Sequence, residues 1–460
     1  MSKQDKKELR QQIACEWLEN NYLSFSSLRH DVITDRLQIR CADSTGEEAI
    51  RRGGDRQERW RNLTDKDINT MVCNCVAESQ VNINVSEMWT ALKSDMVPAV
   101  HPIRAWLEGL KPYTPDQPDW IDIVAQQVRV RDSAQNGVEL GSMGQYGVEL
   151  SSQEKTNTTP SNADAYWRQC FKKWFVAMVA SWMKDEVVNH TVLVLIGRQG
   201  IFKTTWLERL IPPELREYSS KLPLSGQITK DDRLRLCENG LLNIDELDAI
   251  CGREMNIVKS LLTSTDVNER AAYGRLKERR VRLASFCAST NNREFLTDIT
   301  GNRRWLPFEV EGIQNPFHTT IPYELIYAQA KYLVDQGWFM YWFDLEEIEK
   351  LEKHNEEFRA LENEEQLLPI LFDIPADGKG EFMTTAEISD KLVTYGGIKK
   401  PMNIRKLNAI LERHGFNAAR PYVDGKQVRG WLVYKRKQDE IEIKQKELAN
   451  KSQRHEDMLY

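Results

Sequence analysis

The chain has 460 residues, of which 41% are hydrophobic and 29% are charged, so its composition is that of an ordinary globular protein. This length predicts two to three domains with a sizeable core. The net charge is only −6, which excludes a protein that is basic throughout and requires any nucleic-acid-binding surface to be local.

The sequence lacks the patterns that are typical of secretion, membrane insertion and metal binding. The N-terminal run MSKQDKKELRQQ is charged and has no apolar core, so we expect no secretory signal. The longest apolar stretch, residues 174–183, is too short to span a bilayer and is flanked by lysines, so we expect no membrane partner. Of eight cysteines only Cys73 and Cys75 lie close together, and they lack the spacing of a zinc site. These observations favour a cytoplasmic protein with reduced cysteines.

Residues 1–135 are predicted to form a mixed α+β domain, whose role the sequence leaves open. Residues 31–40 alternate like a strand, whereas residues 84–96 and 101–110 have helical periodicity. Residues 136–162 are rich in Gly, Ser, Thr and Asn and contain GVEL twice. We interpret this stretch as a flexible linker or surface insertion.

A long helix is predicted to open the central domain, residues 163–345, with Ser161 or Asp164 as its N-cap. Its large apolar side chains recur every three or four residues and form a wide stripe; they are Trp167, Phe171, Trp174, Phe175, Met178 and Trp182. Such a stripe is typical of a core helix, and we assign it no functional role.

Residues 190–211 have the pattern of a strand, a glycine-rich turn and a helix. The run HTVLVLIG suits a buried parallel strand, and TTWLERLI starts a helix. Between them stands the pattern of a phosphate-binding loop (P-loop), whose amides wrap phosphate, whose lysine neutralises the β- and γ-phosphates and whose hydroxyl ligates Mg²⁺. The predicted ATP contacts are Gly197, Gln199, Gly200, Ile201, Phe202, Lys203, Thr204 and Thr205, with Lys203 catalytic and Thr204 on the metal.

Phe202 occupies the position before the lysine, where a P-loop normally has glycine. If φ is positive there, the side chain costs about 1–2 kcal/mol and weakens the site. If the residue is helical, the side chain is tolerated. The amides of residues 200–204 form the cradle in either case. The alternative is a helix N-terminus that binds no ligand, and the other motifs must decide between the two.

A second motif of a nucleotide site follows at residues 240–248, GLLNIDELD, where an apolar strand ends in Asp245 and Glu246. This is the arrangement of a Walker B motif, in which Asp245 holds the Mg²⁺ shell and Glu246 polarises the attacking water. The gap of 42 positions from Lys203 to Asp245 (245 − 203) leaves room for a helix and a crossover.

Two further motifs follow strand-like runs. Residues 281–292 form an apolar run that ends in Thr290-Asn291, and Asn291 is placed to sense the γ-phosphate. Arg303 and Arg304 follow a Gly-Asn turn and precede another strand-like run, a position that suits an arginine finger donated to a neighbour's nucleotide. We favour Arg303 as the finger and Arg304 as its neighbour in the interface. Four motifs at consecutive strand ends favour a working nucleotide site over coincidence.

The runs GRQGIFKTTWLERL, IDELDAI, IVKSLLTSTDVNERAAYGR and STNNREFLTDITGNRRWLPFEV resemble the virulence-associated E family, ATPases of the superfamily 3 helicase type carried by bacteriophages and mobile islands. The resemblance covers about residues 165–345 and is weaker before residue 130. The family usually has Gly at the position of Phe202. Some relatives carry a fused primase, but residues 1–160 contain no primase-like acidic strand cluster, so we do not infer that activity.

The resemblance implies an α/β fold with an AAA+-like P-loop ATPase core, a parallel sheet flanked by helices. It implies a protein that binds ATP and Mg²⁺ and assembles as a homo-oligomeric, hexameric ring around single-stranded or forked DNA. It also implies the cytoplasm of a bacterial host, with phage or host replication proteins as further partners.

A candidate DNA contact lies in VNERAAYGRLKERRVR, residues 267–282, which has six basic residues around Tyr273 and Gly274. In superfamily 3 helicases this region forms a hairpin that lines the channel, and the resemblance implies that Arg275, Lys277 and Arg279 hold backbone phosphates here. The alternative is a solvated basic hairpin.

The C-terminal part is predicted to comprise a helical connector (346–380), a winged-helix-like DNA-binding domain (381–437) and a charged tail (438–460). Two helical runs precede a hairpin signal at Asp424-Gly425. Residues 384–437 carry 12 Lys and Arg against 4 Asp and Glu, a net charge of +8 (12 − 4). Docking on an acidic partner or on the ring is the alternative to DNA binding. The candidate DNA contacts are Lys399, Lys400, Arg405 and Lys426.

The sequence therefore predicts an ATP-dependent DNA helicase or helicase-like replication motor of a phage or mobile element. An ATP-dependent switch or loader that binds DNA without unwinding it has the same motifs. A non-catalytic DNA-binding protein with a vestigial nucleotide site is the third interpretation, and Phe202 is the observation in its favour.

Overall fold

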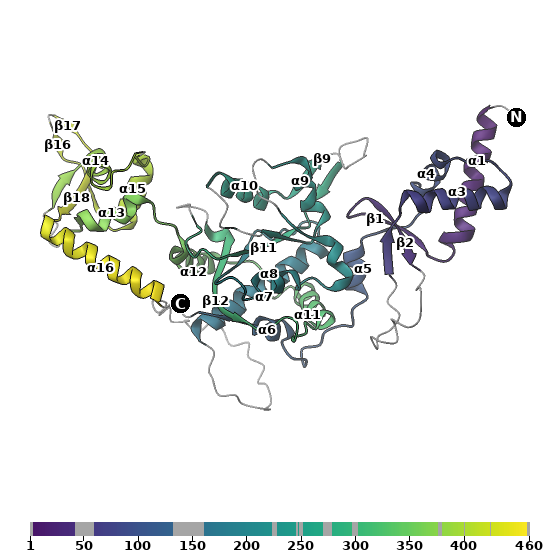
Figure 1. Ribbon diagram of the computed structural model, residues 1–460, viewed down its shortest axis with the longest axis horizontal. Helices are drawn as coiled ribbons and strands as arrows, with labels where there is room; N and C mark the ends of the chain where they lie inside the picture. Colours follow the sequence, from purple (N-terminus) through teal and green to yellow (C-terminus); the bar gives the residue numbers. More distant parts are fainter. Residues whose placement is uncertain are drawn as a thin grey trace. The chain divides into compact units, whose positions relative to one another are not determined.

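The computed structural model describes residues 3–41, 59–131, 161–222, 228–244, 247, 252–269, 278–296, 302–375, 380–399, 401–423 and 425–457. The chain divides into two compact units between Phe358 and Arg359. Figure 1 colours the first unit from purple to green and the second from green to yellow.

The N-terminal part of the first unit combines helices with a four-stranded sheet of order β3-β2-β1-β4. Strands β1 and β4 are parallel, and the other neighbours are antiparallel. The elements are α1 (Lys3–Leu18), the π-helical η1 (Glu19–Leu23), β1 (Leu28–Asp31), β2 (Arg36–Cys41), β3 (Arg59–Asn62), α3 (Asp65–Ser79), α4 (Val85–Leu92) and β4 (Ala99–Val100). The helix predicted over residues 84–96 is confirmed as α4, although it ends earlier.

The prediction of one strand over residues 31–40 is wrong, because β1 and β2 are joined there by a tight turn. The fully buried carboxylate of Asp31 accepts the N–H of Ile33 at 2.9 Å and the hydroxyl of Thr34 at 2.5 Å. Asp35 takes a left-handed φ of 55°, which aspartate adopts more readily than a branched residue. These local bonds reverse the chain, so the alternating pattern continues into a second, antiparallel strand.

The centre of the first unit is a six-stranded sheet of order β5-β12-β6-β11-β8-β7. Its strands are β5 (Val128–Val130), β6 (Val192–Ile196), β7 (Ser219–Lys221), β8 (Leu241–Ile244), β11 (Ser285–Thr290) and β12 (Trp305–Ile313). Five strands are parallel, and β5 pairs antiparallel with β12 at one end. Numbered along the chain, the parallel strands have the order 5-1-4-3-2, which places β11 between β6 and β8. The predicted α/β class with a parallel sheet is confirmed.

Helices cover both faces of this sheet (Figure 1). On one face α7 (Asn162–Met183) packs against α11 (Tyr323–Gln336) and buries the predicted aromatic stripe, with Trp167 and Trp182 at most 1% exposed. Ser161 caps α7 by accepting the N–H of Asp164, as predicted. On the other face the sheet packs against α9 (Lys230–Glu238) and α10 (Gly252–Thr263). No helix in the described ranges is long and apolar enough to cross a membrane.

The remaining elements of the first unit connect these layers. They are α5 (Pro102–Glu108), which confirms the helix predicted over 101–110, α6 (Trp120–Ala125), α8 (Lys203–Glu208), the 3₁₀ turn η2 (Pro213–Tyr218), β9 (Asp266–Glu269), β10 (Glu278–Val281), the 3₁₀ turn η4 (Asn302–Arg304), α12 (Leu345–Asn355) and η5 (Glu356–Phe358). Strands β9 and β10 pair antiparallel as a separate ribbon.

The second unit contains two helices followed by an antiparallel hairpin, as the sequence predicts. Strand β18 lies between β13 and β14 and also pairs with β15. The elements are α13 (Asn363–Leu371), β13 (Phe372–Asp373), β14 (Glu381–Met383), α14 (Thr385–Gly396), α15 (Ile404–Arg413), β15 (Asn417–Ala419), β16 (Tyr422–Val423), β17 (Lys426–Gln427), β18 (Gly430–Lys435) and α16 (Gln438–Asp457). Gly425 has a φ of 76° between the paired strands β16 and β17, while Asp424 lies outside the described residues.

Candidate functional site

The glycine-rich turn between β6 and α8 has the backbone that its glycines allow. Gly197 has a φ of 155°, and a Cβ at this position would lie only 2.9 Å from the carbonyl oxygen of Val310. Gly200 has a φ of 86°, a conformation that side chains disfavour. A Cβ at Gly200 would meet nothing within 4 Å, so the turn is open on that side.

Phe202 adopts the left-handed conformation, with φ 68° and ψ 18°, directly before α8. Of the two conformations considered from the sequence, the structure therefore has the one with positive φ. A phenylalanine in this region costs about 1–2 kcal/mol. Its ring lies edge-on to the ring of Phe317, with the centroids 6.2 Å apart. This contact offsets part of the backbone cost, because an aromatic pair contributes about 0.5–1.5 kcal/mol.

Lys203 folds back over the turn rather than pointing into solvent. Its Nζ donates to the carbonyl oxygens of Gly197 at 2.6 Å and Arg198 at 2.7 Å, and to Oδ1 of Asn291 at 3.0 Å. The residue is only 7% exposed. The turn thus holds one ammonium group at its centre, directly beside the end of β11.

Thr204 and Thr205 follow the lysine in the first turn of α8, and both are half-buried. The hydroxyl of Thr204 lies 2.9 Å from the hydroxyl of Ser289 on β11. Gln199 is exposed in the turn, and Ile201 packs at the margin of the core.

Two polar residues on the strands of this sheet were not found by sequence reasoning. Ser289, which contacts Thr204, stands one residue before the end of an apolar run. Asn243 on β8 is 2% exposed, and its carboxamide has no hydrogen-bond partner among the described residues. The signal for each in the sequence was a polar residue within an otherwise apolar strand. Such a residue also occurs in ordinary protein cores, where its polar group has a hydrogen-bond partner.

The carboxyl edge of the sheet, where the parallel strands end together, collects three of the predicted motifs. Ile196 pairs with Thr290, and Ile244 pairs with Ala288, so β6 and β8 both end beside β11. Asp245 and Glu246 directly follow Ile244, but they lie outside the described residues. The structure therefore brings Lys203 and Asn291 together and leaves the geometry of the acidic pair undescribed.

Arg303 and Arg304 lie at the opposite edge of the sheet. They form η4, and the next residue, Trp305, pairs with Val192 at the start of β6, whereas the glycine-rich turn follows Ile196. Four residues of strand separate the two edges by about 13 Å. Arg303 is exposed, and the pKa of Arg304 is lowered by burial and by the neighbouring Arg303 charge. Both arginines therefore lie far from the glycine-rich turn of their own chain.

The turn that carries these arginines is anchored from below by α12. The carboxamide of Asn355, which is fully buried, donates to the carbonyl oxygens of Asn302 at 2.7 Å and Trp305 at 3.0 Å. This anchor fixes the backbone on both sides of the pair and leaves Arg303 exposed. The arrangement presents one guanidinium at the surface.

The β9–β10 ribbon contains one of the predicted DNA contacts in its described part. Arg279 is exposed and donates to Asp266 across the ribbon at 2.6 Å. Arg275 and Lys277 belong to the connection between the strands and lie outside the described residues. Below the ribbon Arg282 is fully buried and donates to backbone carbonyl oxygens, including those of Leu262 and Asn189, both at 2.8 Å.

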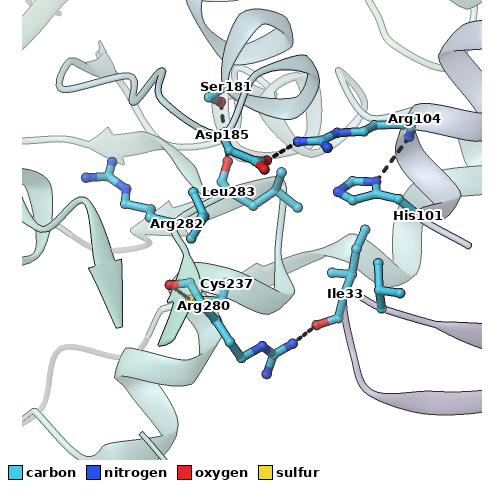
Figure 2. Close-up of a pocket in the computed structure, with 11 residues that line it drawn as sticks. Ile33, His101, Arg104, Ser181, Asp185, Cys237, Arg280, Arg282 and Leu283 are labelled. Carbon is cyan, nitrogen blue, oxygen red and sulfur yellow. Dashed lines mark hydrogen bonds and ion pairs between the residues drawn. The ribbon is translucent and has the colours of Figure 1, made fainter. Parts of the chain in front are cut away.

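A pocket of about 180 Å³ lies beside this ribbon (Figure 2). Arg280 donates to the carbonyl oxygen of Ile33 in the β1–β2 turn and pairs with Glu238 at 3.2 Å. Across the pocket Arg104 pairs with Asp185, and Nδ1 of His101 accepts the Arg104 N–H at 3.2 Å. The charged side chains of Arg280 and Arg104 are thus bonded to other protein groups. The Arg280 contact joins the β1–β2 turn to the β9–β10 ribbon.

The same pocket holds a histidine that stays neutral. Burial, and then the Arg104 charge, lower the pKa of His101 to about 4. The sulfur of Cys237 is also buried there, which raises its pKa to about 11. At neutral pH the imidazole of His101 is therefore uncharged and the Cys237 thiol is protonated.

In the second unit the predicted DNA contacts that the structure describes, Lys399, Arg405 and Lys426, are exposed. Lys400 lies outside the described residues. Other basic residues of this unit are paired: Lys406 contacts Glu362, and Arg429 lies 3.0 Å from Glu412. The positive charge counted from the sequence is therefore partly neutralised locally.

Comparison with known proteins identifies the central part of the chain. Residues 152–360 match the model of the virulence-associated protein E-like domain. No curated protein matches the chain. An apo structure of the NrS-1 C-terminal region is similar over 90% of this chain and 97% of that one, with 11% identity and a TM-score of 0.44. Another apo form of this region covers 90% and 98% with 12% identity and a TM-score of 0.43. The similarity to the virulence-associated protein E-like domain thus lies in residues 152–360, which include most of the six-stranded sheet.

Proposed function

We propose that this protein is an Mg²⁺-dependent ATPase with an AAA+-like core that acts on DNA as a helicase or helicase-like replication motor. The observation that carries the proposal is the position of Lys203. Its ammonium lies between two carbonyl oxygens of the glycine-rich turn and the carboxamide of Asn291. One cation at a glycine-rich turn, beside a polar side chain that follows the neighbouring strand, is an arrangement suited to a triphosphate.

The strand order supports this assignment. Since β11 lies between β6 and β8 and all three strands are parallel, their carboxyl ends lie at one edge of the sheet. Open α/β sheets bind ligands at such an edge, where neighbouring strands connect in different directions. Asn291 is thus proposed to report on the γ-phosphate that Lys203 holds.

The residues present fit ATP and Mg²⁺. The turn is open at Gly200, where a Cβ would meet nothing within 4 Å. Thr204 presents a hydroxyl paired with that of Ser289. Thr204 and Asp245 are proposed to hold the metal ion, which when bound neutralises charge on the phosphates.

The reaction needs a base and a second positive charge. Glu246 is proposed to accept the proton of the attacking water. Arg303 is proposed to stabilise the γ-phosphate of a neighbouring subunit, because it lies at the far edge of the sheet from its own phosphate turn. This geometry supports assembly as a ring, for which six subunits are proposed from the family resemblance.

DNA is the proposed substrate of the motor. The β9–β10 ribbon carries exposed Arg279 together with Arg275 and Lys277, and is proposed to follow the DNA backbone in the ring's channel. The second unit is proposed to be a winged helix that binds duplex or forked DNA through Lys399, Lys400, Arg405 and Lys426. From the family resemblance we propose a role in replication of a phage or mobile element.

The test is ATP hydrolysis by the full chain with Mg²⁺, with and without single-stranded DNA, together with strand displacement on a forked duplex. We expect Mg²⁺-dependent turnover that DNA stimulates, and a Glu246→Gln variant that binds ATP but turns over far more slowly. Turnover without strand displacement assigns the protein to the ATP-dependent switches. Absence of both ATP binding and hydrolysis contradicts the proposal and makes the site vestigial, with the left-handed Phe202 as the reason.

A further inference from the structure

A largely solvent-exposed phenylalanine side chain lies beside the glycine-rich turn that is proposed to hold the phosphates. Phe317 is 77% exposed, although its ring contacts that of Phe202, the residue directly before Lys203. Large apolar side chains are normally buried, and an exposed one next to a binding turn calls for a ligand or partner.

The loop that carries Phe317 is held by specific hydrogen bonds. Oδ1 of Asn315 accepts the N–H of Phe317 at 2.9 Å. The carbonyl oxygen of Asn315 accepts the N–H groups of His318 and Thr319, at 3.0 and 3.1 Å. The ring is thus displayed by an ordered turn, so ordering it on binding costs little conformational entropy.

The same loop is tied to the elements on either side of the site. Arg209, at the end of α8, donates to the carbonyl oxygen of Thr319 at 2.9 Å. Gln314 donates its N–H to the carbonyl oxygen of Gln127 at 2.8 Å. The position of Phe317 relative to the phosphate turn is therefore set by the core of the first unit.

Phe202 completes an aromatic surface there. The two rings meet edge to face at an interplanar angle of 81°. Glycine at position 202 would avoid the left-handed strain but would leave Phe317 without this neighbour. The phenyl group at 202 thus supports a second aromatic ring whose outer surface is free to contact a planar group.

We propose that Phe202 and Phe317 form a stacking platform for the base of the nucleoside triphosphate whose phosphates the turn holds. In such a ligand the ribose and α-phosphate separate the base from the terminal phosphates, so a base contact belongs beside the turn and not within it. Phe317 has that position, because its ring contacts the ring of Phe202, which directly precedes Lys203. This inference rests on the proposed function, because it concerns the same site.

Stacking recognises the π-face that every base possesses. The platform therefore adds affinity for nucleoside triphosphates as a class. It adds little discrimination between the bases, because the two phenyl rings carry no hydrogen-bonding groups.

The experiment compares two ligands by isothermal titration calorimetry of the full chain: Mg·ATP, and Mg·tripolyphosphate, which has the phosphates without the base. We expect Phe317→Ala to weaken Mg·ATP binding about 5- to 100-fold and to leave Mg·tripolyphosphate binding unchanged. Phe317→Tyr keeps an aromatic face and should bind both ligands as the wild type does. Trp338→Ala removes another exposed aromatic, 62% exposed, and serves as the matched control that alters neither.

Phe202→Gly gives an independent check, since it removes the supporting ring while relieving the backbone. We expect weaker Mg·ATP binding together with equal or tighter Mg·tripolyphosphate binding. Equal losses for both ligands in Phe317→Ala, or no change for either, overturn the platform while the proposed function stands. A wild type that binds neither ligand overturns the proposed function and the platform with it.

Discussion

Nζ of Lys203 lies 3.0 Å from Oδ1 of Asn291, although the two residues are 88 positions apart in the chain. The contact exists because β6 and β11 are adjacent and parallel, with Ile196 paired to Thr290. Each residue follows the end of its own strand, so the sheet brings a cation and a carboxamide to one point. The predictions about the site depend on this contact.

Lys203→Ala should lower Mg²⁺-dependent ATP hydrolysis at least about 100-fold, since it removes the one ammonium at the centre of the phosphate turn. The carbonyl oxygens of Gly197 and Arg198 lose their donor, so stability should fall by about 1–3 kcal/mol without loss of the fold. Steady-state turnover and urea unfolding measure the two effects. Lys221→Ala, at a surface lysine, is the control and should behave as wild type. Wild-type turnover in Lys203→Ala contradicts the P-loop assignment.

Asn291→Ala should reduce the turnover number about 10- to 100-fold while the dissociation constant of Mg·ATP changes less than about fivefold. The carboxamide contacts Lys203 from a neighbouring strand and is not part of the turn that holds the phosphates. Single-turnover kinetics and equilibrium binding separate the two quantities. Asn292→Ala is a matched control, because the Asn292 carboxamide closes a local turn with Glu294. A large loss of affinity with unchanged turnover would assign Asn291 to binding instead.

Arg303→Ala, inactive alone, should restore hydrolysis when mixed with inactive Lys203→Ala. Arg303 lies at the sheet edge away from the glycine-rich turn of its own chain, so the proposal assigns it to a neighbour's site. An arginine finger contributes about 10³- to 10⁵-fold in rate, which makes partial rescue measurable. Arg304→Ala is tested in the same way, to rank the two. Absence of rescue with either variant, in a protein that stays monomeric with ATP and DNA, rejects the ring.

Changing Lys399, Arg405 and Lys426 together to Glu should weaken binding to duplex DNA and flatten its dependence on salt. All three are exposed on the second unit, and loss of three phosphate contacts lowers the slope of log K against log salt by about 2.7. Binding titrations at several salt concentrations measure the slope. A control changes Lys6, Lys66 and Lys111 to Glu, which alters the net charge equally on exposed residues of the first unit. Equal effects of the two sets would exclude a DNA contact on the second unit.

His101→Asn should make the fold less sensitive to acid. Burial lowers the pKa of His101 to about 4, whereas the unfolded residue titrates near 6.5. Between these values the unfolded chain binds a proton that the folded chain does not, so stability falls as the pH falls from about 6.5 to 4. Asn keeps the N-cap acceptor for the Arg104 N–H and removes the proton. The urea midpoint at pH 7 minus that at pH 5 should be smaller in the variant, and an unchanged difference contradicts the assignment.

Local patterns in the sequence were enough to predict most individual elements. The β-branched run before Gly197, the apolar stripe behind Ser161 and the Gly425 turn each appear where the pattern indicates, because short-range sterics, capping and burial determine them. The α/β class with a parallel sheet follows from the alternation of such strands and helices. The prediction of one strand over residues 31–40 was wrong because the Asp31 carboxylate accepts hydrogen bonds from Ile33 and Thr34 and turns the chain. The alternation of apolar and polar residues carries no information about such bonds.

Only the tertiary structure decided which residues meet. The order β12-β6-β11-β8 puts Asn291 against Lys203 and sends Arg303 to the opposite edge, since strand order depends on long-range packing and not on any local pattern. The left-handed φ of Phe202 and its contact with Phe317 likewise depend on a loop 115 positions away (317 − 202) that the core holds in place. The sequence by itself determined the residue types and elements from which the proposed nucleotide site is built. Their convergence required the sheet, because pairing between distant strands depends on the packing of the whole core.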